Sequence, residues 1–465
     1  MRRIPAYILI ILIIARLDPL TGCANIIPPG GGPRDSLPPI LINVTPRDST
    51  TNFAGGKIVL TFNEFVEVNN LQENLVVSPL PKILPVVDAH LRTITIRIKD
   101  TLEPNTTYSL NFGKAIRDIN EGNELKNFRY IFSTGSTFDS LEFAGKVILA
   151  ETGKYDSTLI VILHRRLDDS AVINERPRYF AKVDANGNFR FNNLPPETYA
   201  VYALEDAGGQ KKYLSRTQTF GFIDQAVKVS ENTPAVTIFA YKESKDTRAT
   251  GTTATSTQNR TTDKVLRLST NLDNTLLDLL NDLEITFGIP LKTFDTTKLR
   301  LTNEVFETIQ GSKWTLDSTR KKATLDNAWI ENRGYHLIFD KDFAEDSAGR
   351  KLVRNDTLTF RTRRATDYGS LNLRFINLDL TKHPVLQFVI GDQVRYSHVF
   401  TDRNVNIPLF APGDYDLRLL YDSNQNGKWD PGEFFGKRRQ PEIVLPLSRK
   451  INVKANWDNQ IDITL

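Results

Sequence analysis

Residues 422–433 carry oxygen-bearing side chains at the spacing of a calcium-binding loop. Acidic or amide side chains occupy the first, third, fifth, ninth and twelfth positions, which are Asp422, Asn424, Asn426, Asp430 and Glu433. Gly427 stands at the sixth position, where such a loop turns sharply, and Lys428 at the seventh would bind through its backbone carbonyl. The spacing predicts a calcium site with the weak affinity of extracellular modules. The alternative is a turn, rich in Asn and Gly, between two strands.

An internal comparison bears on this choice. A similar strand earlier in the chain ends at Asp206, and the sequence that follows it, AGGQKKY, lacks the acidic and amide side chains. A hairpin turn requires no acid at the ninth and twelfth positions, so the second loop has more ligands than a turn needs. Two Asn in place of Asp and the nearby bases 437–439 lower the expected affinity.

No other group of residues predicts catalysis. The histidines are too far apart in sequence to suggest a metal pair; they are His90, His164, His336, His383 and His398. A single cysteine excludes zinc bound by several thiolates, and neither a G-x-S-x-G elbow nor a phosphate-binding loop occurs. A catalytic pair of carboxylates is an alternative that the sequence does not exclude, because acidic residues occur throughout the chain. We predict no catalytic residue and no enzyme.

The tryptophans offer a second kind of site. All four lie in the second half of the chain, at Trp314, Trp329, Trp429 and Trp457. Aromatic side chains exposed on β-sandwiches can bind sugars, but large aromatic side chains also fill cores and corners. The sequence alone leaves both interpretations of the tryptophans, sugar binding and packing in the core, as alternatives.

The N-terminus predicts export and a lipid anchor. Two arginines precede an apolar stretch over 6–15, which is too short to span a bilayer and has the length of a signal-peptide core. The motif LTGC over 20–23 resembles the lipobox of bacterial lipoproteins, in which the signal peptide is cut before the cysteine and diacylglycerol is joined to its thiol. The resemblance implies a signal peptide over 1–22 and a lipid on Cys23, the one cysteine of the chain. The alternative is an uncleaved anchor.

Composition limits the partners. The net charge is +4, with acids and bases interspersed, so we predict no nucleic-acid partner. After the first apolar stretch no run is long enough to span a membrane, which predicts attachment to the membrane by the lipid alone.

The sequence pattern in the rest of the chain indicates two copies of a two-part unit. IVLTFNE (58–64) is matched by LEITFGIP (283–290), YSLNF (108–112) by YHLIF (335–339), and FRFNNLPPETYAVYALED, ending at Asp206, by VNIPLFAPGDYDLRLLYD, ending at Asp422. A Thr-rich polar stretch separates the copies and predicts an exposed linker. The predicted order is a tether over 23–37, segment A over 38–136, segment B over 137–243, the linker over 244–263, segment A′ over 264–365 and segment B′ over 366–465.

The pattern predicts an all-β chain of tandem sandwiches. LRTITIRIK (91–99) alternates isoleucines with polar residues, which is typical of a sheet with one buried face. Turn residues return about every ten positions, as in sandwiches. The stretch 274–283 is ambiguous, with a helical appearance.

Segment A resembles the bacterial Ig-like domain of the S-layer SbsA type. The resemblance rests on PPILINVTPRDST, IVLTFNEFVE, LEPNTTYSLNF, RDINEGNEL and YIFSTG, and it extends more faintly to A′. Segment B, through VDANGNFRFNNLPPETYAVYAL, resembles carboxypeptidase-regulatory or prealbumin-like sandwiches, and the whole plan resembles lipoproteins of Bacteroidetes-type bacteria. These resemblances imply Ig-like and prealbumin-like sandwiches in a lipid-anchored protein of the outer membrane. Its role would be structural, adhesive or partner-binding, with an envelope protein or glycan as the partner. The alternative is a carbohydrate-binding component of a glycan-uptake system.

Overall fold

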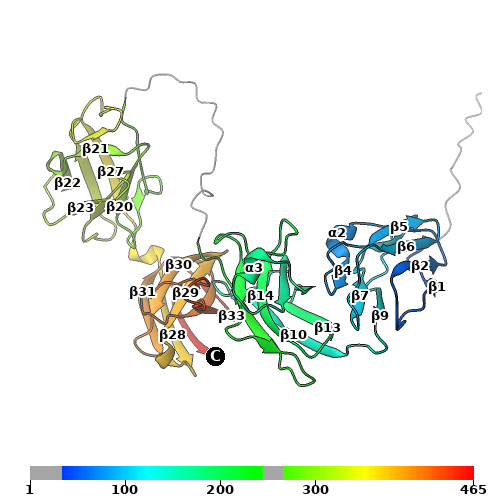
Figure 1. Ribbon diagram of the computed structural model, residues 1–465. Helices are drawn as coiled ribbons and strands as arrows, with labels where there is room; N and C mark the ends of the chain where they lie inside the picture. The colour runs from blue at the N-terminus through cyan, green and yellow to red at the C-terminus, as the bar shows by residue number, and fades with distance from the viewer. Residues whose placement is uncertain (1–33, 245–264) are drawn as a thin grey trace, which may run out of the picture. The chain divides into compact units, whose positions relative to one another are not determined.

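The computed structural model describes residues 34–244 and 265–465, and these form an all-β chain (Figure 1). The predicted signal peptide, Cys23 and nearly all of the Thr-rich stretch lie outside the described residues. The chain divides into two compact units, residues 1–138 and 139–465. Among the residues described, we find no helix with the length and apolar character needed to cross a membrane.

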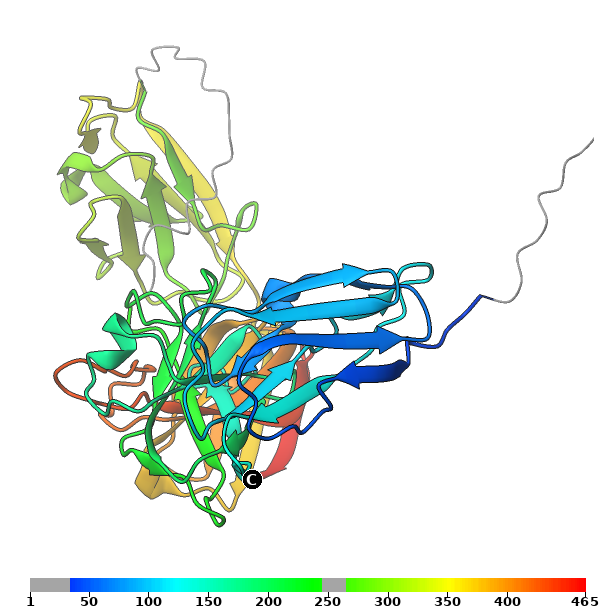
Figure 2. The same cartoon turned by 45° about the vertical axis from the view of Figure 1, so that its right-hand side comes forward.

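The first unit contains two main sheets around one core, and its strands are blue to cyan in Figure 2. One sheet has the order β1 (Leu41–Thr45), β2 (Gly56–Phe62), β6 (Thr93–Ile98), β5 (Val86–His90), and the other has β4 (Val76–Ser78), β7 (Thr107–Asn111), β9 (Arg129–Ser133). Strands β3 (Val66–Val68) and β8 (Ile116–Asp118) pair, and α2 (Leu71–Asn74) is a single turn. Along β6, Ile94 and Ile96 are fully buried while Arg97 is exposed, as the alternation predicts.

Segment A′ repeats this plan. One sheet has the order β18 (Leu268–Thr270), β20 (Leu283–Phe287), β24 (Lys322–Asp326), β23 (Lys313–Leu316), and the other has β19 (Leu276–Leu277), β27 (Asp356–Thr362), β25 (Gly334–Phe339), β22 (Leu299–Asn303). Strands β21 (Leu291–Phe294) and β26 (Ala344–Asp346) pair, and a short 3-10 turn occurs at Thr296–Lys298. Two more 3-10 turns lie at Ala365–Asp367, where A′ ends, and at Leu380–Lys382 in segment B′. The ambiguous stretch 274–283 forms β19 and turns, with no helix.

Segments B and B′ share a different topology. In B, one sheet has the order β13 (Asn188–Leu194), β10 (Leu141–Leu149), β17 (Val236–Ala240). The other has the order β12 (Tyr179–Lys182), β11 (Leu159–His164), β14 (Thr198–Glu205), β15 (Phe220–Phe222). Strand β16 (Val227–Lys228) pairs with β14, and α3 (Ala171–Asn174) is a single turn. In B′, one sheet has the order β31 (Asn404–Phe410), β28 (Gly369–Ile376), β34 (Asp458–Thr464). The other has the order β30 (Gln393–Val399), β29 (Pro384–Ile390), β32 (Gly413–Tyr421), β33 (Ile443–Val453). Each three-stranded sheet contains one parallel pair, β10–β17 in B and β28–β34 in B′.

The same hydrogen bonds close the corners of A and A′. The hydroxyl of Tyr108 accepts a hydrogen bond from the backbone N–H of Glu103 at 3.0 Å, and that of Tyr335 accepts one from Ile330, also five residues earlier, at 3.2 Å. The Thr134 hydroxyl donates to the carbonyl of Glu103 at 2.6 Å, and Thr362 donates to that of Ile330 at 2.5 Å. The corner is therefore retained although the Pro-Asn-Thr sequence of A is replaced in A′.

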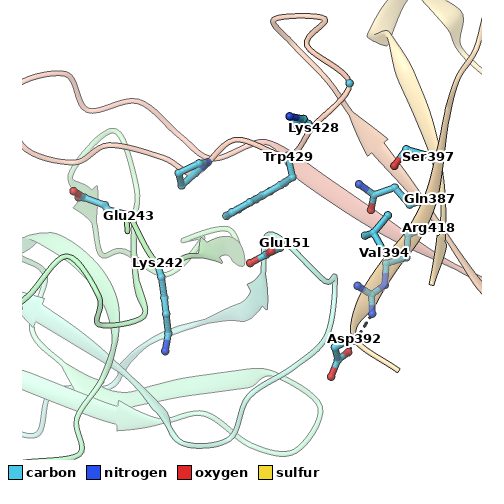
Figure 3. Close-up of a pocket in the computed structure, with 12 residues that line it drawn as sticks. Glu151, Lys242, Glu243, Gln387, Asp392, Val394, Ser397, Arg418, Lys428 and Trp429 are labelled. Carbon is cyan, nitrogen blue, oxygen red and sulfur yellow. Dashed lines mark hydrogen bonds and ion pairs between the residues drawn. The ribbon is translucent and has the colours of Figure 1, made fainter. Parts of the chain in front are cut away.

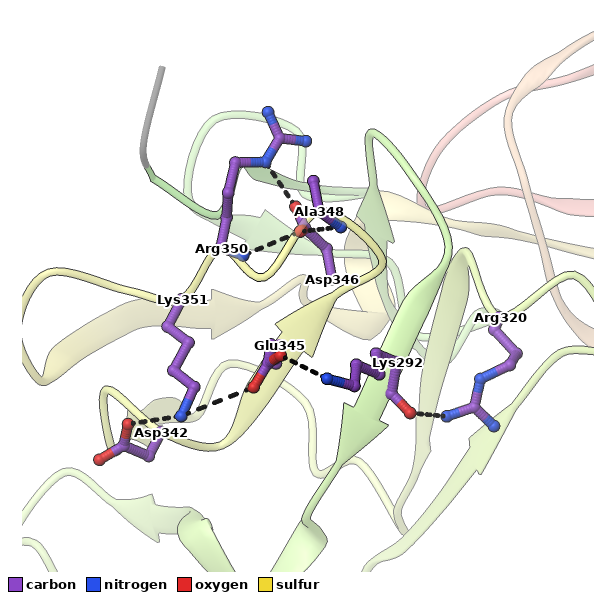
Figure 4. Close-up of polar contacts among 8 residues, drawn as sticks. All are labelled: Lys292, Arg320, Asp342, Glu345, Asp346, Ala348, Arg350 and Lys351. Atoms are coloured by element: carbon purple, nitrogen blue, oxygen red, sulfur yellow. Dashed lines mark hydrogen bonds and ion pairs between the residues drawn. The ribbon is translucent and has the colours of Figure 1, made fainter. Parts of the chain in front are cut away.

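A buried aspartate organises the turn after β8 and after β26. Asp346 is 1% exposed, and its carboxylate accepts hydrogen bonds from the backbone of Ala348 at 2.9 Å and Arg350 at 3.0 Å (Figure 4). Burial raises the pKa of Asp346, but these bonds and the 2.7 Å ion pair with the Arg350 side chain outweigh burial and hold the pKa below its ordinary value. Asp118 is equally buried and binds the backbone of 121–123 in the same way.

Candidate functional site

The predicted calcium loop lies between β32 and β33. Strand β32 ends at Tyr421, as expected, and Asp422 follows with 1% exposure. The Asp422 carboxylate accepts a hydrogen bond from the backbone N–H of Gly427 at 2.6 Å and a longer one from Asn426 at 3.3 Å. Gly427 has a φ of +76°, a conformation that other residues rarely adopt. Asp422 and Gly427 therefore close the loop together.

Asp430 joins the two asparagines. Its Oδ2 accepts hydrogen bonds from the side-chain amides of Asn424 and Asn426, both at 2.6 Å. The Oδ1 of Asn424 accepts from the backbone of Asn426 at 3.1 Å, and that of Asn426 accepts from the backbone of Lys428 at 2.7 Å. The structure therefore connects four of the predicted ligands: Asp422, Asn424, Asn426 and Asp430.

Glu433 lies apart from this group. Its side chain forms an ion pair with Lys437 at 2.9 Å, and its backbone pairs with Arg439. The hydrogen bond from Lys437 lowers the pKa of Glu433. No contact described in the structure joins Glu433 to Asp422 or Asp430.

A different glutamate completes the loop, and the sequence reasoning missed it. Glu442 is 8% exposed; its Oε1 accepts from the backbone and hydroxyl of Ser423, both at 2.8 Å, and its Oε2 accepts from the backbone of Asp430 at 3.0 Å. The Trp429 indole N–H donates to the Glu442 carbonyl at 2.7 Å. Because Glu442 lies outside the loop, immediately before β33, a search of a twelve-residue window could not find it.

The loop is held by hydrogen bonds between its own side chains and backbone. For the four connected residues to bind a cation, the two asparagine amides would have to turn their oxygens toward it, since they now donate N–H groups to Asp430. In the part of the chain that the structure describes, no group of three or more His, Cys, Asp or Glu side chains is placed to hold a metal ion. Calcium binding stays a prediction.

The end of this loop docks on segment B. Phe434 is fully buried, and its ring lies 5.0 Å from those of Phe220 and Phe222 and 5.6 Å from that of Tyr202. Its backbone N–H donates to the carboxylate of Glu243 at 3.1 Å. A side chain of B′ therefore packs against the outer face of the β14–β15 sheet of B.

Polar contacts surround the buried Phe434 side chain, which is called the Phe434 plug below. Arg438 forms an ion pair with Asp169 and donates to the carbonyls of Ile223 and Asp224, each at 3.1 Å. Gly432 approaches B so closely that an added Cβ would lie 2.5 Å from the Tyr241 ring. A larger residue at 432 would push the two segments apart.

A cavity of about 420 Å³ opens beside the plug (Figure 3). The loop contributes Gly427, Lys428, Trp429 and Pro431, the β30–β29–β32 sheet contributes Gln387, Asp392, Val394, Ser397 and Arg418, and segment B contributes Glu151, Lys242 and Glu243. Its volume lies within the range of about 300–1,000 Å³ that is usual for ligand pockets.

Three polar side chains of the cavity come from one row of the sheet. Gln387 pairs in register with Ser397 of β30 on one side and with Arg418 of β32 on the other. In-register neighbours project from the same face, with Cβ atoms about 4.5–5.5 Å apart. The neighbouring row, Val385, Leu420 and Val444, is apolar, and Trp429 packs over it.

The tryptophans fall into different environments. Trp314 packs against Phe294, with 5.9 Å between ring centroids, and Trp329 packs against Tyr335 at 5.1 Å; both belong to the A′ core. Trp457 is 62% exposed. Trp429 borders the cavity described above.

The histidines do not come together in the described residues. His164 is 2% exposed, and its Nε2 has no hydrogen-bond partner there. Burial lowers its pKa to about 4, with a smaller contribution from Lys212 and an opposing one from Glu175. His164 is therefore a neutral, buried residue at pH 7.

Comparison with known proteins identifies the first domain. Residues 35–134 match the family described as "Bacterial Ig-like domain". This range contains the two main sheets and the tyrosine corner of segment A, so the chain carries a bacterial Ig-like domain and continues as further β-sandwiches. No curated protein matches the chain.

The comparison with solved structures found matches of low similarity. The Bacillus anthracis TIE protein is 10% identical, covering 94% of this chain and 76% of that one, with a TM-score of 0.17. BcpA, the major pilin subunit of Bacillus cereus, is 12% identical, covering 70% of this chain and 99% of its own, with a TM-score of 0.16. The N-terminal part of the bacterial S-layer protein SbsC is 17% identical, covering 44% of each chain, with a TM-score of 0.16. Scores this low carry no functional argument.

Proposed function

We propose that this chain is a non-catalytic lipoprotein of the bacterial cell envelope, anchored in the outer membrane through Cys23, with a structural or adhesive role. Its sandwiches would present surfaces to an envelope protein or glycan, and the membrane would be contacted through the lipid. A Bacteroidetes-type source is part of the same proposal.

One observation carries this proposal most directly. The single cysteine of the chain follows an apolar stretch, within LTGC, and a bacterial Ig-like domain begins at residue 35. A multiply acylated cysteine binds membranes firmly, whereas one acyl chain alone binds reversibly. Tandem sandwiches on such an anchor suit a role in holding their surfaces away from the membrane for a protein or glycan partner.

Cys23→Ala tests the anchor. The variant should accumulate as a precursor or leave the membrane fraction on washing, while the parent stays in the membrane fraction and partitions into detergent. Protease treatment of intact cells then distinguishes a surface-exposed chain from a periplasmic one. If the Cys23→Ala variant partitions into detergent like the parent, the lipid anchor is wrong.

A carbohydrate-binding component of a glycan-uptake system is the second candidate. The observation that favours it is the cavity bordered by Trp429, because aromatic rings beside polar side chains suit sugar rings. Intact cells lacking the protein would then lose glycan uptake, whereas a purely structural role predicts a change in envelope integrity.

A further inference from the structure

We propose that the cavity between the β30–β29–β32 sheet and loop 427–431 binds a sugar that carries a carboxylate, of the hexuronic acid class. This inference does not depend on the lipid anchor or on calcium. It rests on two buried polar side chains with unused hydrogen-bonding capacity and on the aromatic ring beside them.

Gln387 is the first of these side chains. It is 4% exposed and lines the cavity, and its amide points toward Trp429 in Figure 3. Within residues 34–244 and 265–465, no hydrogen bond to the Gln387 side chain is found. The amide atoms of Gln387 are not among the fully buried polar atoms that lack a partner, so they are accessible from the cavity, where a ligand that both donates and accepts would take the place of water.

Arg418 is the second. Its side chain is 5% exposed, and in the described structure its guanidinium, with five N–H groups, contacts only Asp392, at 3.3 Å. Asp392 is 67% exposed and already binds Lys154 at 2.5 Å. The guanidinium therefore has further N–H groups that are accessible from the cavity, and a planar carboxylate can take two of its N–H groups in parallel.

The remaining walls suit a hydroxylated ring. Ser397 lies in the same row as Gln387 and adds a hydroxyl at the exposed end. Trp429 adds an aromatic wall, and its indole N–H is already used by Glu442. A ring with one apolar face and equatorial hydroxyls would contact the indole, while its hydroxyls reach Gln387 and Ser397.

Charge favours an acidic sugar over a neutral one. Lys428 and Lys242 also line the cavity, and Lys242 forms an ion pair with Glu205 at 3.8 Å. Three acids also line the cavity, and each has a partner: Glu243 accepts from the backbone of Phe434, Asp392 is paired as described, and Glu151 has a polar or electrostatic interaction of its own. A neutral sugar would add no negative charge at the Arg418 guanidinium, whose ion-pair partner in the described residues is the exposed Asp392.

The test is calorimetric titration of the full chain with sodium D-glucuronate, D-glucose and sodium acetate, with tryptophan fluorescence as a second readout. We expect saturable binding of glucuronate, and binding of glucose and acetate that is weaker by at least about tenfold. Arg418→Gln should weaken glucuronate binding by about tenfold or more. Arg374→Gln is the matched control, because Arg374 is 65% exposed on the other sheet of B′.

A second variant keeps the test decisive if Arg418→Gln lowers the melting temperature. Ser397 is exposed, so Ser397→Glu should leave folding intact, while its longer, negatively charged side chain projects into the cavity from the same row as Gln387 and abolishes binding of the glucuronate anion. Absence of glucuronate binding at millimolar concentrations overturns the proposal. Equal binding of acetate reduces the site to a simple anion site and also overturns it, as does unchanged binding in Ser397→Glu.

Discussion

Phe434→Ala should separate segments B and B′ once the chain is cut between them. The Phe434 side chain is fully buried among Tyr202, Phe220 and Phe222, all of which belong to B. Removing a buried Phe side chain costs about 3–5 kcal/mol when the cavity does not collapse. Each 1.4 kcal/mol is tenfold in affinity, so association of the cut halves should weaken by roughly 10²- to 10⁴-fold.

The assay requires a specific protease site placed within the Thr-rich stretch 244–263. After cleavage, the halves of the parent should elute together in size-exclusion chromatography, because the plug, the Arg438 contacts and the backbone bond from Val444 to Ala150 at 2.9 Å remain. The halves of Phe434→Ala should elute apart. Phe306→Ala is the control, since Phe306 is 60% exposed in A′. Separation of the parent halves, or co-elution of the variant halves after equal dilution, would refute the packing argument.

Three further predictions follow from single side chains. The folded-state pKa of His164 is about 4, below the ordinary 6.5, so the unfolded chain binds a proton first as pH falls. The free energy of unfolding, measured with denaturant, should therefore drop by about 2 kcal/mol between pH 7 and pH 5. His164→Phe should reduce that drop. Millimolar calcium should raise the melting temperature of the full chain and Asp422→Ala should abolish the rise, whereas no rise in the parent would leave the loop as a turn. Tyr108→Phe and Tyr335→Phe should each cost about 0.5–1.5 kcal/mol, because each removes one corner hydrogen bond, and a tenfold difference in the effects of the two would contradict equivalent corners.

Local patterns were enough to predict the class of fold. The alternation around Ile94 and Ile96 predicted a sheet with one buried face, because the side-chain period of a strand is two. The bacterial Ig-like resemblance of segment A is confirmed by the match over 35–134. The stretch 274–283 could not be assigned, since short apolar runs fit a helix and a strand equally well, and the partner strand β27 decided the outcome.

The candidate sites also divide into residues that the local sequence could select and residues that only the fold brings together. Sequence spacing alone selected Asp422, Asn424, Asn426 and Asp430, which the structure connects, because these residues lie within one short loop and close contacts there depend mainly on local turns. It selected Glu433 too, but missed Glu442, whose contact with the loop depends on where β33 returns. The row Ser397, Gln387 and Arg418 and the Phe434 plug join residues far apart in sequence. Strand register and the packing of B′ on B bring them together, and neither leaves a local pattern in the chain.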